Sequence, residues 1–241
     1  MCVIWLCRFR WVACRLDELK RCTKRKTSLQ YILDHLPETL EATYDQILSR
    51  IPPADASDAV KLLLWLAFAH EPLHIDYLAI IVEFDIDKKA FNSDAKLSSS
   101  EDILNICSSL VTKMGDNTVQ LAHASVQTYV QEKPRIIQPD IVMDPSIGNT
   151  FVGQFCLTYL LHTKETHPDS PMHLLKEPIR ERYKQSLIRH SAKYWPRHIQ
   201  ANIQGMAGSD LMKKLFVDRS FVFHNWVKVH NYDIESNLFS L

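Results

Sequence analysis

Residues 101–133, EDILNICSSLVTKMGDNTVQLAHASVQTYVQEK, decide the fold. An acidic start typical of a helix N-terminus leads into a short apolar helical pattern at 103–107. Two strand patterns follow, at 110–113 and 118–121, with turn residues between them. We expect Gly115 to supply the positive φ that the turn of this hairpin needs.

A second helical pattern begins directly after His123 and covers residues 124–131. A helix, a hairpin and another helix on this scale are typical of a winged-helix module. This is the only β-hairpin that the sequence indicates. The predicted fold is therefore mainly α: a helical segment, a winged-helix domain with one small β-hairpin, and a further helical region.

Helical patterns also lie on the N-terminal side of this module. Amphipathic helices are expected at 5–19, 29–36 and 40–51, each with its apolar residues on one face. The next pattern, 58–69, leaves hardly any polar face, so that helix should be buried nearly all round. A helix at 75–83 follows, and a polar stretch then leads into the hairpin.

The core should combine the apolar helix at 58–69 with the hairpin, because a lone two-stranded hairpin is marginally stable in water. The residues expected to share this core are Leu63, Trp65, Leu66, Ile103, Ile106, Leu110 and Val119. Beyond the hairpin, Pro134 and Pro139 indicate a linker. Further helical patterns begin near residue 149 and end at Trp195-Pro196 and at Trp226.

The charge and cysteine content limit the kinds of partner. With 28 basic and 28 acidic side chains in 241 residues, the formal net charge is zero, so neither nucleic acid nor an anionic membrane is implied. Six cysteines without Cys-x-x-Cys or zinc-finger spacing indicate reduced thiols and no metal site. The apolar start at 1–7 lacks a basic leader and is too short to span a membrane, so we expect a cytoplasmic protein.

Nucleotide-binding and hydrolytic motifs are missing. No glycine precedes Gly115, and the pair Gly148 and Gly153 lacks the lysine and hydroxyl that complete a phosphate-binding loop. We therefore expect no cofactor and no ATP hydrolysis by this chain alone. His123 and Ser125 do not predict a catalytic triad with Asp116, since a serine and a histidine two apart at a helix start seldom face each other. The chain is not expected to be an enzyme.

Several phrases together resemble one family, the large fungal NACHT-type (STAND) signalling ATPases, many of which end in ankyrin repeats. These phrases are FRWVAC at 9–14, LPETL at 36–40, LWLAF at 64–68, EDIL at 101–104, CSSLV at 107–111, LAH at 121–123, CLTYLL at 156–161 and AKYWP at 192–196. Their order and spacing match from residue 9 to about 233. The winged-helix part also resembles the domain named after GPI inositol-deacylase.

The resemblance implies a piece of such a protein, without its nucleotide-binding core or its repeats. The implied divisions are 1–27 for a remnant helix from the end of a NACHT domain, 28–57 for a helical spacer, 58–135 for the winged helix and 136–241 for a C-terminal helical region. In this family the winged helix folds back on the nucleotide domain and holds ADP in the resting state. The implied partner is therefore a NACHT nucleotide-binding domain, in cis or in trans.

His123 is the one site residue that the resemblance implies. In similar signalling ATPases, a histidine at the junction of hairpin and helix faces the β-phosphate of ADP. The alternative is that His123 only caps the helix at 124–131. An acidic residue follows the histidine in the plant pattern, whereas Ala124 stands here.

DNA binding is the alternative function for a winged helix. The helix that would enter the major groove, 102–110, has no Lys or Arg. Residues 101–133 carry two lysines against four acidic side chains, so their net charge is 2 − 4 = −2. DNA affinity depends on neutralising phosphates, which makes a winged-helix nucleic-acid-binding protein the less favoured interpretation.

Overall fold

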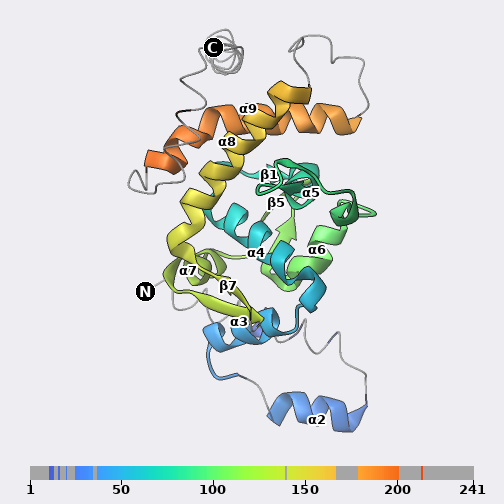
Figure 1. Cartoon of the computed structure of the whole chain (residues 1–241). Coiled ribbons are helices and arrows are strands. Elements are labelled where there is room, and N and C mark those ends of the chain that lie inside the picture. The colour runs from blue at the N-terminus through green and yellow to red at the C-terminus, as the bar shows by residue number, and fades with distance from the viewer. Residues whose placement is uncertain are drawn as a thin grey trace, which may run out of the picture. The chain divides into compact units, whose positions relative to one another are not determined.

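The computed structural model describes residues 11–13, 16, 20, 25–34, 37–138, 140–166, 179–200 and 213. These residues are mainly helical, as predicted, and they also form small antiparallel sheets (Figure 1). The chain divides into two compact units. The first joins Met1–Ala67 with Glu101–Pro145, and the second joins Phe68–Ser100 with Ser146–Leu241.

The first unit contains the elements that the sequence places around the hairpin. Its helices are α2 (Lys26–Asp34), α3 (Leu40–Ser49), nearly all of α4 (Pro53–Phe68), α6 (Asp102–Cys107), the 3-10 turn η2 (Ser108–Leu110) and α7 (Ala124–Glu132). Its strands are β4 (Val111–Lys113), β5 (Thr118–Leu121), β6 (Arg135–Gln138) and β7 (Ile141–Met143). Thr39 caps α3 by accepting a hydrogen bond from the Ala42 amide at 3.1 Å. Pro53 is the first residue of α4, where a helix needs no amide donor.

The β4–β5 hairpin forms where it was predicted, but its turn is built differently. Val111 pairs with Leu121 and Lys113 with Val119 in antiparallel register. Asn117, with a φ of 63°, takes the left-handed conformation that we expected at Gly115, and no described glycine has a positive φ. Asparagine tolerates this conformation better than most residues that carry a Cβ.

The predicted core is confirmed with one exception. Six of the seven residues are at most 8% exposed: Leu63, Trp65, Ile103, Ile106, Leu110 and Val119. Leu66 is only half-buried. The burial of the other six residues in α4, α6, η2 and β5 agrees with the expectation that two short strands need apolar cover from other elements.

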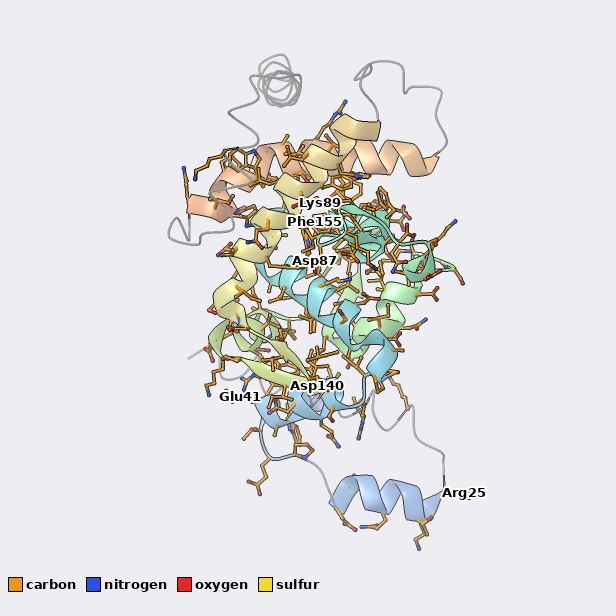
Figure 2. The ribbon with its side chains drawn as sticks, viewed as in Figure 1. Arg25, Glu41, Asp87, Lys89, Asp140 and Phe155 are labelled. Atoms are coloured by element: carbon orange, nitrogen blue, oxygen red, sulfur yellow. The ribbon has the colours of Figure 1, made fainter. Side chains whose placement is uncertain are left out.

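Two more hairpins are present, so the prediction of a single hairpin was wrong. β6 and β7 pair antiparallel, with Ile136 opposite Val142, where the prolines had indicated a linker. Pro134 directly precedes β6, a place where a strand tolerates proline, and Pro139 lies outside the described residues. Figure 2 shows Asp140 at the turn of this hairpin and Glu41 on α3.

The second unit contains the third hairpin and two long helices. Its elements are β1 (Leu73–His74), α5 (Ile75–Glu83), β2 (Phe84–Asp85), β3 (Ala90–Phe91), η1 (Ser93–Ala95), α8 (Gly148–Thr166) and α9 (Ile179–Gln200), and the short turn η3 (Pro145–Ile147) leads into α8. β2 and β3 lie at the start of the stretch expected to be merely polar, and Figure 2 labels Asp87 and Lys89 on their turn. Phe84 of β2 packs edge-on against Phe155 of α8, with ring centroids 5.3 Å apart.

Helix α9 runs past Trp195-Pro196, where a helical run was expected to end, and continues to Gln200. The residues after the proline are held by α8. At Gly153 of α8, an added Cβ would lie 3.0 Å from the Ile199 side chain and 3.2 Å from that of His198. Gly153 thus allows α8 to approach α9 closely at the residues that follow the proline.

The predicted N-terminal helix lies largely outside the described residues. Residues 11–13, 16 and 20 are helical, and Val12 and Leu16 are 45% and 51% exposed. Phe9, Leu19 and Trp226 also lie outside the described residues. Within the described part of the chain, no helix combines the length and the apolar character needed to cross a membrane.

Candidate functional site

His123 lies at the junction between the β4–β5 hairpin and α7. Its backbone is extended, with φ −164° and ψ 152°, and it is the N-cap residue of α7. The His123 carbonyl accepts a hydrogen bond from the Val126 amide at 2.9 Å. The side chain is half-buried. The sequence placed His123 at this junction, and the capping role is observed.

The imidazole uses one nitrogen for both of its hydrogen bonds to described residues. Nδ1 accepts from the Ser125 amide at 3.1 Å and lies 2.6 Å from the Ser125 hydroxyl oxygen. The expectation that Ser125 and His123 would not face each other was wrong. In an N-cap, the side chain reaches the amide two residues ahead, and this brings the Ser125 side chain onto the ring.

This arrangement is not that of a Ser-His-Asp triad. Ser125 contacts Nδ1, the nitrogen that would face the aspartate in a triad. Asp116 accepts hydrogen bonds from the Thr118 amide and hydroxyl at the opposite end of β5. Within the described residues, no group of three or more His, Cys, Asp or Glu side chains is arranged to hold a metal ion.

Helix α3 reaches the same site from a distant part of the chain. The Tyr44 hydroxyl lies 2.9 Å from the Ser125 oxygen, so a chain of three side chains leads from α3 to His123. Tyr44 is 1% exposed, and its ring packs edge-on against Tyr129 of α7 at 5.1 Å. The sequence analysis missed Tyr44, since 81 residues separate it from Ser125.

A second polar contact fixes α3 against α7. The Tyr129 hydroxyl donates to Asp45 at 2.5 Å, and the Arg135 guanidinium lies over the Tyr129 ring, 4.1 Å from its centroid. Burial, together with the hydrogen bond to Asp45, raises the pKa of Tyr129. The phenol therefore stays neutral and keeps its proton available for Asp45.

Helix α6 and strand β4, which would contact DNA in a winged helix, offer few basic side chains. Helix α6 has only six residues and no basic side chain. Lys113 of β4 forms an ion pair with Glu101, just before α6. One of the two lysines in residues 101–133 is therefore already neutralised.

Comparison with known proteins identifies the segment that carries this site. Residues 44–138 match the family model described as the winged helix domain of GPI inositol-deacylase. This segment is a winged-helix domain. The match includes His123 and both residues of its hydrogen-bond chain, Tyr44 and Ser125. No solved structure matches the chain.

A curated relative extends beyond the winged-helix domain. The azaphilone pigments biosynthesis cluster protein L of Monascus ruber is 28% identical over 236 residues. The alignment covers 92% of this chain and 48% of the relative. The chain thus spans about half the length of that protein.

Proposed function

We propose that this chain is a regulatory interaction module of a NACHT-type signalling ATPase. The winged-helix domain docks on a nucleotide-binding domain, in cis or in trans, and stabilises its ADP-bound resting state. The chain performs no catalysis of its own and takes its nucleotide from the partner. The match of residues 44–138 to a winged-helix domain and the greater length of the relative support this proposal.

The observation that carries the proposal is the state of the His123 ring. Because Nδ1 accepts from the Ser125 amide, the proton of the neutral ring belongs on Nε2. A phosphate oxygen can only accept a hydrogen bond, so Nε2–H is the group that suits it. The N-terminus of α7 adds a partial positive charge at the same place. His123 thus combines the capping role with a donor for the β-phosphate of ADP.

The alternative of nucleic-acid binding gains no support from the site. Phosphate contacts dominate such binding and need Lys or Arg. Helix α6 has neither, and Lys113 is paired with Glu101.

The test is His123→Ala in the module joined to an intact NACHT ATPase. Hydrogen bonds to charged groups contribute about 1.5–3 kcal/mol, so ADP should dissociate roughly tenfold faster or more. The measurement is the release of a fluorescent ADP analogue on dilution, alongside spontaneous activation.

His74→Ala is the matched control. His74 caps α5 in the same way, with Nδ1 accepting from the Asp76 amide at 3.3 Å. This change removes a histidine cap without touching the proposed phosphate donor, so ADP release should stay at the wild-type rate. Unchanged ADP release in His123→Ala, or equal acceleration in both variants, would contradict the proposed function.

A further inference from the structure

The β6–β7 hairpin exposes an apolar pair on one of its two faces. Ile136 and Val142 lie opposite each other in the antiparallel ladder and are 73% and 49% exposed. The next residue along each strand, Ile137 and Met143, is buried. The hairpin therefore packs one face into the first compact unit and leaves two adjacent apolar side chains in water on the other.

Carboxylates stand at both ends of this apolar pair. Asp140, labelled in Figure 2 at the turn of the hairpin, is exposed, and Asp144, directly after β7, is half-buried. Each is two residues away from Val142 along the chain. We call Ile136, Val142, Asp140 and Asp144 the hairpin face. Its composition suits a partner surface that is both apolar and basic.

The same compact unit presents a surface of that kind near its N-terminus. Val12, Leu16 and Lys20 are helical and exposed, with 45% and 51% exposure for the two apolar residues. Because they are four residues apart, they share one side of a helix, and we call them the helix face. Five Lys or Arg residues and no acidic residue stand at positions 20–26, so the basic character continues beyond Lys20.

The two faces do not cover each other within one chain. Both belong to the first compact unit, and the apolar residues of both are exposed in the same structure. The indole nitrogen of Trp11 donates to the Pro37 carbonyl at 3.1 Å, which ties the start of the helix face to the segment before α3. A single chain thus carries two complementary faces, each of which still needs a partner.

We propose that copies of this chain associate head to tail, with the helix face of one copy on the hairpin face of the next. The apolar residues of the two faces then cover each other, and Lys20 approaches Asp140 and Asp144. A contact between two identical faces is disfavoured, because it would bring carboxylates against carboxylates or lysines against lysines. A head-to-tail contact leaves one face of each kind available at the ends, so association continues beyond the dimer into a ring or an open chain. This inference does not depend on the proposed function.

The experiment compares two complementary variants of the full chain by analytical ultracentrifugation. Val12→Gln with Leu16→Gln makes the helix face polar, and Ile136→Thr with Val142→Thr makes the hairpin face polar. Each replacement suits the local helix or strand. The average mass of the wild type should rise with concentration from the 27.9 kDa of one chain to beyond that of a dimer. Each double variant alone should stay monomeric. An equimolar mixture of the two should form a heterodimer and nothing larger, because each supplies one intact face.

Leu33→Gln is the matched control. Leu33 of α2 is 49% exposed in the same compact unit but belongs to neither face. This variant should associate like the wild type, and added salt should weaken the association of both proteins, because it screens the charges.

A wild type that stays monomeric at high concentration would overturn the proposal. Association of either double variant alone would also overturn it, because that result requires a contact between like faces. A mixture that stays monomeric, or a loss of association in Leu33→Gln, would count against it in the same way. No nucleotide enters this measurement, so its outcome is independent of the ADP release that tests the proposed function.

Discussion

Asn117, at the turn of the β4–β5 hairpin, carries a backbone strain that glycine would relieve. Its φ is 63°, whereas Gly115 two residues earlier is not in the positive-φ region and an added Cβ there would meet nothing within 4 Å. Asn117→Ala should therefore lower the free energy of unfolding by about 1 kcal/mol, because alanine lacks asparagine's tolerance of this region. Urea denaturation followed by circular dichroism measures the change.

Gly115→Ala is the control for this turn and should act in the opposite direction. The change restricts the unfolded chain without straining the fold, so it should raise the free energy of unfolding by about 0.4–1 kcal/mol. If Gly115→Ala lost stability and Asn117→Ala did not, Gly115 rather than Asn117 would be the residue with the left-handed conformation.

At the same scale, the sequence predicts the place of His123 but not its environment. A strand pattern that ends shortly before a helical one locates the junction. The facing of Ser125 and His123 depends on the local cap geometry, and the general rarity of such pairs gave the wrong expectation. Tyr44 could not be predicted, because its contact with Ser125 across 81 residues exists only once α3 and α7 pack together.

Among the elements, α4 depends on α7 at its C-terminal end. The Ala67 carbonyl, in the last turn of α4, accepts from the side-chain amides of Gln127 at 3.1 Å and Gln131 at 2.6 Å. Carbonyls in the last turn lack partners within their own helix and carry partial negative charge. Gln131→Glu should thus remove a donor and add a repulsion, lowering the free energy of unfolding by about 1–2 kcal/mol.

Gln131→Met separates the two causes, since it removes the donor without adding charge. The expected order of urea midpoints is wild type, then Gln131→Met, then Gln131→Glu. The gap between the last two should shrink in high salt, because the repulsion is screened. Equal midpoints for all three proteins would mean that the contact adds nothing to stability.

The helices and strands also show which elements can be predicted from sequence patterns and which cannot. The helix predicted at 75–83 is observed as α5 (Ile75–Glu83), since a dense apolar run starts after a capping histidine. The β2–β3 hairpin was missed because its strands have only two residues each, too few for an alternating pattern. The β6–β7 hairpin has strands as long as those of β4–β5, but Pro134 and Pro139 suggested a linker, although Pro134 stands just before β6.

Over the whole molecule, the second compact unit contains a group of titratable side chains where α9 meets the loop after α4. Glu71 accepts from His190 at 3.0 Å and from Tyr194 at 2.5 Å. The hydrogen bond from His190 comes first among the causes that lower the pKa of Glu71 to about 2. His198 lies nearby, fully buried, with its ring 4.6 Å from that of His70. From these contacts and the low pKa of Glu71 we expect the stability of the unit to fall in acid.

His198 determines the pH at which the loss of stability in acid begins. Burial, with His70 and His190 close by, lowers its pKa from 6.5 to about 3. Between these values the unfolded chain binds a proton that the folded one does not, so stability falls as the pH drops below 6.5. Glu71 works in the same direction at lower pH: its stabilising contribution is complete above about 4.5 and is lost as the pH falls through about 2.

The expected result is a loss of stability in α8 and α9 under mild acid. At about pH 5, the cost from His198 alone is roughly 2 kcal/mol. Hydrogen exchange of the α8 and α9 peptides, corrected for the intrinsic effect of pH, measures this loss of stability between neutral pH and about pH 5.

His198→Asn is the control variant. Its side chain keeps a donor for Asn149, which His198 Nδ1 meets at 3.1 Å, but it cannot titrate. This variant should be less stable at neutral pH because it loses the buried ring, yet its protection should decline less with acid. An equal decline in both proteins would assign the acid sensitivity to groups other than His198.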